Sequence, residues 1–141
     1  MTTHAEPSGA ELHRAYERAF EERDRQALLN LIAEDAQWHV FGDSAFAGTI
    51  RGRDAIWEKF AAPQWDTPRQ MEVHEVLESE DHIVVLGEVS FSQPGGASRF
   101  KTVEVYHYDG GQLTERWFFV DRRRDLDALL DRIAAADGPD T

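Results

Sequence analysis

The sequence predicts an α+β fold, with helices packed against a mostly antiparallel sheet. Apolar residues recur three or four positions apart in residues 11–32, a spacing typical of amphipathic helices. In four segments after residue 69, apolar and polar residues instead alternate, as they do in half-buried strands. Glycine-rich turns at residues 94–96 and 109–111 separate some of these segments, so neighbouring strands are expected to be antiparallel.

The helices are predicted from their apolar stripes and their end signals. The first covers residues 11–23, and Asp24 is placed to cap the second. A third helix covers residues 54–62, where Pro63 stops it, and a closing helix covers residues 125–136. The stripe residues are Leu12, Ala15, Tyr16, Ala19 and Phe20 in the first helix, and Leu28, Leu31 and Ile32 in the second.

The strands are expected at residues 36–41, 70–78, 82–92, 99–108 and 112–121. A two-residue turn within residues 109–111 sets the pairing of the last two strands, and side chains alternate between faces. Extending the pairing to the preceding strand places Gly87 opposite Glu104, where a missing side chain would leave room beside the carboxylate. The face of Glu104 is expected to carry Phe100, Thr102, Tyr106 and Tyr108, with Leu113, Glu115, Trp117, Phe119 and Asp121.

Composition limits the classes of function. A net charge of −12 and a pI near 4.8 argue against binding nucleic acid or an anionic membrane surface. The absence of cysteine excludes disulfides, thiolate chemistry and zinc sites with sulfur ligands. We find neither a secretory signal in MTTHAEPSGAE nor an apolar run of membrane-spanning length, so a cytoplasmic protein is expected. Residues 11–136 are expected to form one domain between flexible tails, residues 1–10 and 137–141.

The segment Ala36–Phe60 reads AQWHVFGDSAFAGTIRGRDAIWEKF, a short strand, a glycine-punctuated loop and a capped helix. With two helices before it and four strands after it, the chain resembles the family of ketosteroid isomerase, scytalone dehydratase, the SnoaL-type polyketide cyclases and nuclear transport factor 2. The resemblance covers roughly residues 11–133. It implies a cystatin-like cone: a curved, mostly antiparallel sheet wrapped around three N-terminal helices, enclosing one pocket, with a short C-terminal helix.

Glu104 is the first candidate for chemistry. It is flanked by Val103 and Val105 and shares its predicted face with Trp117, so burial should raise its pKa and keep it protonated near neutrality. The resemblance implies the same role, because Glu104 falls where ketosteroid isomerase carries a protonated oxyanion-hole aspartate. Tyr16 falls where that family carries its oxyanion-hole tyrosine. The alternatives are a glutamate paired with an arginine or facing solvent, and a tyrosine that only fills the core.

The base of the isomerase has no counterpart here. The family's base is an aspartate followed by proline, and the matching positions are Val40 and Phe41. Phe60 stands near the position of a tyrosine that supports the family's oxyanion hole. Valine cannot carry a proton, so a replacement base has to come from elsewhere in the chain.

Two residues are candidates for that base. Asp121 ends the last strand on the predicted face of Glu104, and SnoaL-like sequences often end in an aromatic-rich strand followed by Asp. The competing interpretation is a turn or salt-bridge residue. His39 titrates in the range where a general base is useful, but alternation turns it away from the pocket if Trp38 and Val40 line it.

The rest of the pocket wall is predicted to be aromatic and apolar. Depending on the register of its strand, either His74 or Glu75 would also face the pocket. No cofactor-binding motif occurs, and the histidines show no metal-site spacing, so neither a cofactor nor a metal is expected. The residues expected to line the pocket are Trp38, Val40, Phe60, Tyr106, Trp117 and Phe119.

The favoured function is a cofactor-free acid–base enzyme: an isomerase, dehydratase or polyketide-type cyclase acting on a small hydrophobic molecule. Tyr16 and Glu104 would donate hydrogen bonds to a developing enolate, and Asp121 or His39 would move the proton. The alternative is a non-catalytic small-molecule-binding or accessory protein that keeps the pocket and has lost the base, which Val40 favours. A pure protein-interaction module fits less well, because the pocket face carries ionisable groups.

The other face of the sheet is expected to be apolar, and an apolar area of this size is rarely left to water on a monomer. We therefore predict a two-fold homodimer packed sheet to sheet, as in several relatives of this fold. Arg116 and Glu88 would lie on this outer face and could pair across the interface. Its apolar residues are predicted to be Val84, Leu86, Val103, Val105, Phe118 and Val120.

Overall fold

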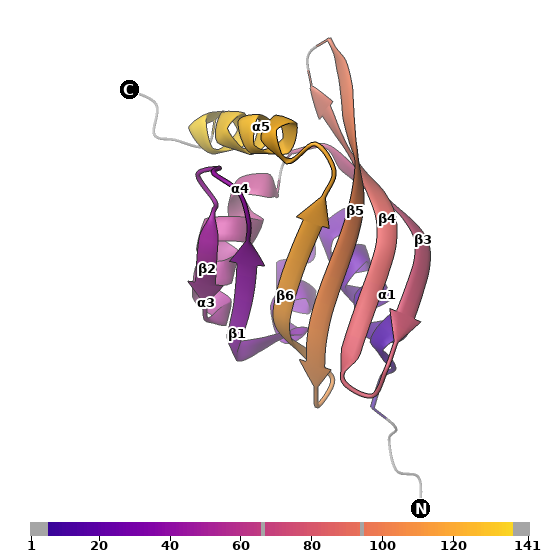
Figure 1. Cartoon of the computed structure of the whole chain (residues 1–141). Helices are drawn as coiled ribbons and strands as arrows, with labels where there is room; N and C mark the ends of the chain where they lie inside the picture. The colour runs from indigo at the N-terminus through magenta and orange to yellow at the C-terminus, as the bar shows by residue number, and fades with distance from the viewer. Residues whose placement is uncertain (1–5, 66, 94, 137–141) are drawn as a thin grey trace, which may run out of the picture.

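A curved sheet wraps around a layer of helices (Figure 1), as the sequence predicts, and it has six strands, one more than expected. The computed structural model describes residues 6–65, 67–93 and 95–136. The strand order is β2-β1-β6-β5-β4-β3, and every neighbouring pair is antiparallel except β1 with β6. The elements are α1 (Gly9–Glu21), α2 (Arg25–Asn30), β1 (Ile32–Val40), β2 (Gly48–Arg51), α3 (Arg53–Ile56), a π-helical segment (Trp57–Ala61), α4 (Ala62–Gln64), β3 (Arg69–Glu78), β4 (His82–Gln93), β5 (Gly96–Asp109), β6 (Gln112–Val120) and α5 (Arg123–Ala136).

The first two helices begin at side-chain caps. Ser8 forms a capping box with Glu11, so α1 begins two residues earlier than predicted. Asp24 caps α2 as predicted, because its Oδ1 accepts a hydrogen bond from the Ala27 N–H at 3.1 Å. None of the helices in the described ranges is long and apolar enough to cross a membrane. Of the predicted flexible tails, residues 1–10 and 137–141, the parts at 1–5 and 137–141 lie outside the described residues, whereas Gly9 and Ala10 belong to α1.

The first strand is longer than predicted and has a partner that the sequence pattern did not indicate. The chain leaves α2 at Asn30, so Ile32 starts β1 instead of ending the second helix. β2 lies inside the predicted loop of residues 42–52 and pairs with the end of β1. Four residues are too few for an alternating pattern to be recognised, which explains why β2 was missed.

A β-bulge in β6 reverses the predicted faces of that strand. The turn is as predicted, because Asp109 pairs with Gln112 and Tyr108 with Leu113. The next pair is His107 with Glu115, so Thr114 is an extra residue without a partner. One extra residue turns every later side chain to the opposite face. The inner face therefore carries Arg116, Phe118 and Val120, and the outer face carries Glu115, Trp117 and Phe119.

A second bulge explains the glycine in β4. Gly87 pairs with Thr102, and Val85 lies opposite Glu104, so the predicted pairing of Gly87 with Glu104 is wrong by two residues. A Cβ atom on Gly87 would lie only 2.5 Å from the backbone carbonyl oxygen of Glu72, just before the register of β3 shifts between Val73 and Glu75. This glycine is therefore needed for close backbone approach, not for space beside the carboxylate.

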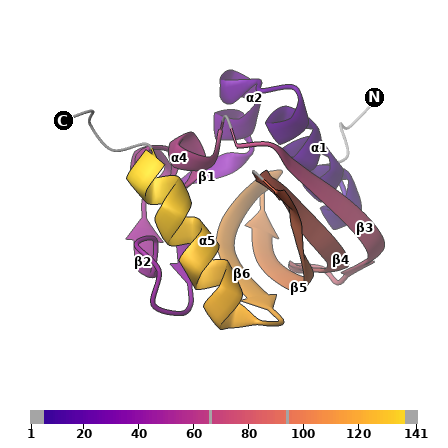
Figure 2. The same cartoon turned by 90° about the horizontal axis from the view of Figure 1, so that it is seen from above.

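The C-terminal helix closes one end of the cone. Figure 2 shows α5 lying across the curved sheet, on the side away from α1. Its apolar residues Leu126, Leu129, Leu130 and Ile133 pack with Phe46, Val89, Phe91 and Phe100 in one core cluster. A separate cluster, centred on α1 and the middle of the sheet, contains Leu12, Tyr16, Trp38 and Tyr106. The space between these two clusters holds the pocket described below.

The outer face of β3 to β6 is not covered by the described helices (Figure 1). With the corrected register, its exposed apolar side chains are Leu77, Val103 and Phe119, which are 48%, 37% and 41% exposed. Phe118, Val120 and Arg116 were predicted on this face and lie on the inner one, because of the bulge. Glu88 lies on the outer face and pairs with Arg99 at 3.3 Å.

We expect this face to be the interface of a two-fold homodimer. Phe119→Asp should convert the dimer to a monomer, because it puts a charge on the most exposed aromatic ring of β6. Light scattering at micromolar concentration measures the result, and Gln26→Asp, at an exposed position of α2 away from this face, is the control. A native protein with a mass near 16.1 kDa would contradict the dimer.

Candidate active site

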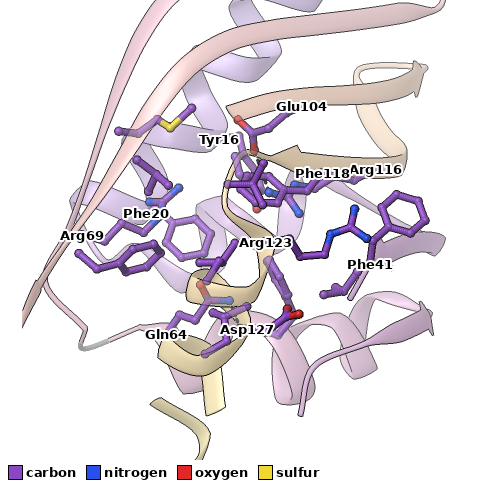
Figure 3. A pocket seen from close by; sticks show the side chains of 18 residues that line it. Tyr16, Phe20, Phe41, Gln64, Arg69, Glu104, Arg116, Phe118, Arg123 and Asp127 are labelled. Atoms are coloured by element: carbon purple, nitrogen blue, oxygen red, sulfur yellow. Dashed lines mark hydrogen bonds and ion pairs between the residues drawn. The ribbon is translucent and has the colours of Figure 1, made fainter. Parts of the chain in front are cut away.

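A mostly apolar pocket lies between the inner face of the sheet, α1 and α5 (Figure 3). The cavity volume is about 60 Å³, which leaves room for a few water molecules. The lining residues include Tyr16, Phe20, Val40, Phe60, Gln64, Arg69, Met71, Phe91, Glu104, Arg116, Phe118, Arg123 and Asp127.

Glu104 and Arg116 form a buried ion pair on the sheet side of this pocket. Arg116 Nη2 donates to Glu104 Oε1 at 2.8 Å, and both side chains are at most 6% exposed. The Tyr106 hydroxyl donates to the same Oε1 at 2.9 Å. Arg116 also packs against the rings of Phe60 and Phe118, with its guanidinium carbon 5.1 Å and 4.9 Å from their centres. The cation is therefore held in a fixed place by an anion and by aromatic rings.

The charge of Glu104 is the reverse of the prediction. Burial raises its pKa, but the His13 imidazole and the Arg116 guanidinium lower it more, to about 2. Burial also lowers the pKa of Arg116, and Tyr106 and Glu104 raise it by more, so Arg116 stays charged. Glu104 is thus an ionised hydrogen-bond acceptor and not a protonated donor. The sequence could not show this, because the predicted register placed Arg116 on the other face.

Tyr16 lies in the same pocket as Glu104. It comes from α1, is 2% exposed, and packs against Tyr106 and Phe20 with ring centres 6.0 and 5.5 Å away. Burial is the largest cause of a pKa raised to about 12, so the hydroxyl is neutral at physiological pH. None of the described residues forms a hydrogen bond with this hydroxyl, which leaves its proton available to a ligand.

Behind Tyr16, a second ion pair joins α1 to β3. Arg69 Nη2 lies 3.4 Å from Glu17 Oε1, and burial raises the pKa of Glu17 although Arg69 opposes this. His13 Nε2 lies 3.8 Å from Glu17 Oε1 and 3.8 Å from Glu104 Oε2. Within the described ranges, neither His13 Nε2 nor Glu104 Oε2 has a hydrogen-bond partner.

These three side chains are close enough to share a ligand atom. Single atoms of His13, Glu17 and Glu104 lie within 4.8 Å of one another. Arg69 and Arg116 already pair with the two carboxylates, so a divalent cation would be buried against two guanidinium groups. The arrangement therefore fits a water molecule or a proton better than a metal ion.

Four other predicted site residues lie inside the cone. Val40 and Phe60 line the pocket as predicted. Trp38 and Tyr106 face inward but are completely buried in the core, and Tyr106 acts on the pocket through its hydroxyl, which donates to Glu104 and accepts from Arg116 Nε.

The two predicted bases do not lie in the pocket. Asp121 is exposed and closes the end of the β5–β6 pair: its Oδ1 accepts from the Lys101 N–H at 2.9 Å, and its own N–H donates to the Lys101 carbonyl. His39 lies on the outer face, where it stacks on Trp117 with ring centres 5.3 Å apart. Its position agrees with the alternation argument, because Trp38 and Val40 face inward.

Four further predictions fail for the same geometric reason. Trp117 and Phe119 follow the bulge at Thr114 and point outward, so neither lines the pocket. His74 sits at the bulge of β3 and Glu75 pairs with Leu86; both are exposed, and neither faces the pocket. Period-two patterns cannot locate an extra residue, so no sequence signal distinguished these faces.

Sequence reasoning missed one carboxylate that faces the pocket, Asp127 of α5. Figure 3 shows it on the side of the cavity opposite Glu104. Its Oδ2 accepts a hydrogen bond from the Asp43 N–H at 3.0 Å. Gly42 has φ 103°, and a Cβ atom there would lie 2.5 Å from Asp127 Oδ1, so this loop fits closely around the carboxylate. The one sequence signal for Asp127 was its position in the closing helix, next to Leu126 of the apolar stripe.

Comparison with known proteins supports the same fold. The sequence profile of the SnoaL-like domain matches residues 12–116. None of the curated protein sequences matches the chain significantly.

Solved structures agree over nearly the whole chain. A protein with a cystatin-like fold from Xanthomonas campestris is 20% identical, with a TM-score of 0.78, over 88% of this chain and 98% of that one. An NTF2-like protein from Burkholderia pseudomallei is 23% identical, with a TM-score of 0.73, over 86% of this chain and 95% of that one. A candidate polyketide cyclase from Sinorhizobium meliloti is 20% identical, with a TM-score of 0.62, over 77% and 93% of the two chains.

These likenesses confirm the cystatin-like α+β cone, with its curved sheet, N-terminal helices and short C-terminal helix. The profile match covers most of the chain and includes Tyr16, Glu104 and Arg116 of the pocket. The chain belongs to the SnoaL-like domain family.

Proposed function

We propose that this protein is a cofactor-free acid–base enzyme that forms an enolate from a small hydrophobic carbonyl compound. The observation that carries the proposal is a neutral Tyr16 hydroxyl beside a fixed Arg116 cation in an apolar pocket. The structural likeness to a candidate polyketide cyclase supports the same class. Isomerisation, dehydration and aldol-type cyclisation all pass through such an enolate and differ in its next step.

Tyr16 and Arg116 would bind the carbonyl oxygen and stabilise its negative charge after proton loss. Arg116 uses Nη2 for Glu104 and Nε for the Tyr106 hydroxyl, and none of the described residues offers an acceptor to Nη1. A guanidinium has five N–H donors, so donors remain for a ligand. Glu104 would keep Arg116 in place. It would not itself donate a hydrogen bond to the carbonyl oxygen, because its low pKa leaves it ionised.

Asp127 is the residue that we propose as the proton acceptor. Glu104 is a poor base, since a carboxylate with a pKa of about 2 binds protons weakly. Asp127 faces the cavity from α5, and none of the described cations forms an ion pair with it. It would take the proton from the carbon next to the carbonyl group, while Tyr16 and Arg116 hold the oxygen.

Hydrogen–deuterium exchange tests this proposal without knowledge of the natural substrate. In D₂O, the protein should speed deuterium uptake at the α-carbon of at least one member of a panel of small aromatic ketones, followed by NMR. Tyr16→Phe should slow this uptake about 10²–10³-fold, because it removes one donor to the enolate oxygen.

The matched control is Tyr108→Phe. The Tyr108 hydroxyl donates to the Ser79 carbonyl at 2.7 Å, outside the pocket, so its loss should leave the exchange rate nearly unchanged. If ketones bind to the pocket but their α-protons exchange no faster than in buffer, the proposed enzymatic activity is wrong. The result would indicate a binding protein instead.

A further inference from the structure

A second set of ionisable side chains lies on the outer face of the sheet, away from the pocket. It contains His39 of β1, Glu115 of β6, His107 of β5, His82 of β4 and Asp81 just before β4. Glu115 contacts two of the histidines: Oε2 lies 2.5 Å from His39 Nε2, and Oε1 lies 3.3 Å from His107 Nδ1. His82 Nδ1 lies 2.8 Å from Asp81 Oδ1.

Each of the two carboxylates lies against the Nδ1 atom of one ring. His82 Nδ1 forms a hydrogen bond with Asp81 Oδ1 at 2.8 Å, and His107 Nδ1 lies at ion-pair distance, 3.3 Å, from Glu115 Oε1. A carboxylate beside Nδ1 favours the tautomer in which Nδ1 carries the hydrogen and Nε2 is free to bind a metal ion.

The two Nε2 atoms face each other. His82 and His107 are directly paired across β4 and β5, and their Nε2 atoms lie 2.5 Å apart. At this distance one ring donates a hydrogen bond to the other, and the tautomers decide which ring is the donor. When neither Nε2 atom carries a hydrogen, both are placed to bind one metal ion.

We propose that His82 and His107 form a Zn²⁺ site on the outer face, with Asp81 and Glu115 orienting the two rings. A carboxylate on the far nitrogen of a ligating histidine is the usual second partner of a zinc-bound imidazole. Zinc binds imidazole nitrogen at about 2.0–2.1 Å and prefers a tetrahedral arrangement, which puts two ligand atoms about 3.3 Å apart. The rings have room to separate by that much, because their side chains are 44% and 37% exposed.

The surroundings favour a cation. A surface depression beside the pair contains acidic side chains and, among the described residues that line it, no lysine or arginine. The chain as a whole carries a net charge of −12, which raises the local concentration of cations. The residues that line the depression are Glu6, Glu80, Asp81, His107, Tyr108, Asp109, Gly110 and Thr114.

Isothermal titration of the untagged, chelator-treated full chain with ZnCl₂ tests the site. We expect one zinc per chain. His82→Gln and His107→Gln should each abolish this binding, because each removes one of two protein ligands. Asp81→Asn should weaken it about 10–100-fold, because it removes only an orienting carboxylate. Far-UV circular dichroism checks that each variant is folded.

Two other histidines supply matched controls. His39→Gln removes a contact with Glu115 but no ligand, so it should keep zinc binding. His74→Gln should also keep it, although His74 lies near Glu72 and Glu88 in another group of possible ligands. Binding that survives in the His82→Gln/His107→Gln double variant, or is lost in His74→Gln, would overturn the proposal.

Copper gives an independent optical readout. The ring of Trp117 lies 5.0 Å from that of His107, so Cu²⁺ held by the pair should quench Trp117 fluorescence. The quenched fraction should disappear in Trp117→Phe and in His107→Gln. The native protein could release no heat of binding with ZnCl₂ and show no quenching with Cu²⁺. That outcome would mean that a proton alone joins the two rings, and it would refute the metal site.

Discussion

Glu104→Gln is expected to lower the free energy of unfolding by about 3–5 kcal/mol. Glutamine has almost the same size, so the change removes the charge and leaves the cavity filled. Arg116 would then be buried with no anion bonded to it, since Glu104 is its ion-pair partner among the described residues. An uncompensated buried charge is among the most destabilising changes a single substitution can make. Urea unfolding followed by circular dichroism measures the loss.

The same pair predicts how stability depends on pH. The pKa of Glu104 is about 2 in the folded protein, below its ordinary value of 4.5, so its ionised form contributes to stability fully above that ordinary pKa. It is lost as the pH falls from about 5 towards 2. The shift corresponds to about 3 kcal/mol, of the same order as the mutational estimate. The native protein and Glu104→Gln should therefore differ most in stability near neutral pH and converge in acid.

Glu88→Gln is the matched control for this prediction. Glu88 also pairs with an arginine, Arg99, at 3.3 Å, but the Arg99 side chain is 64% exposed. Exposed ion pairs contribute about 0–1 kcal/mol, so this change should have little effect. A loss below about 1 kcal/mol for Glu104→Gln, similar to the control, would contradict the description of Glu104–Arg116 as a buried ion pair.

A double variant separates stability from function. Replacing a buried ion pair by apolar residues of similar size is often neutral or stabilising. Glu104→Leu/Arg116→Met should therefore recover much of the stability that Glu104→Gln loses. It should still fail to exchange ketone protons, because the Arg116 cation is gone. This result would mean that the ion pair serves to place the Arg116 cation in the pocket and is not needed for the stability of the fold.

Asp127→Asn is expected to lower the rate of α-proton exchange about 10²–10⁴-fold, the usual cost of losing a general base. Asparagine keeps an oxygen that can accept the Asp43 N–H, so the packing of the loop on α5 should survive. Ketone binding should change little, because Tyr16 and Arg116 hold the oxygen. NMR exchange rates in D₂O, together with a binding titration by fluorescence, measure the two effects separately.

Asp131 provides the control on the same helix. Its Oδ1 accepts a hydrogen bond from the Ala45 N–H at 2.6 Å, so it joins α5 to the same loop, but it does not line the pocket. Asp131→Asn should leave the exchange rate nearly unchanged. Equal losses in the two variants would mean that both act by positioning the helix, and the role of Asp127 as a base would be wrong.

The helices and most strands were predictable because the signals are local. The stripe that includes Leu12 and Tyr16, the cap at Asp24 and the turn at Gly110 each depend on residues a few positions apart. The resemblance of Ala36–Phe60 to a family then led to the cone, and the solved structures bear this out. Matching the chain to the positions of that family implied that Tyr16, Val40, Phe60 and Glu104 would meet at one pocket, and all four line it.

The sequence by itself therefore determined the fold class, the family and which residues share each uninterrupted stretch of strand. Only the tertiary structure decided the chemistry of the pocket. One unpaired residue, Thr114, turns Arg116 inward and Trp117 outward, and so makes Glu104 an ionised partner of a cation instead of a neutral acid. Alternation repeats every two residues and carries no information about where an extra residue is inserted. That position follows from how β6 packs between β1 and β5, which brings together segments far apart in the chain.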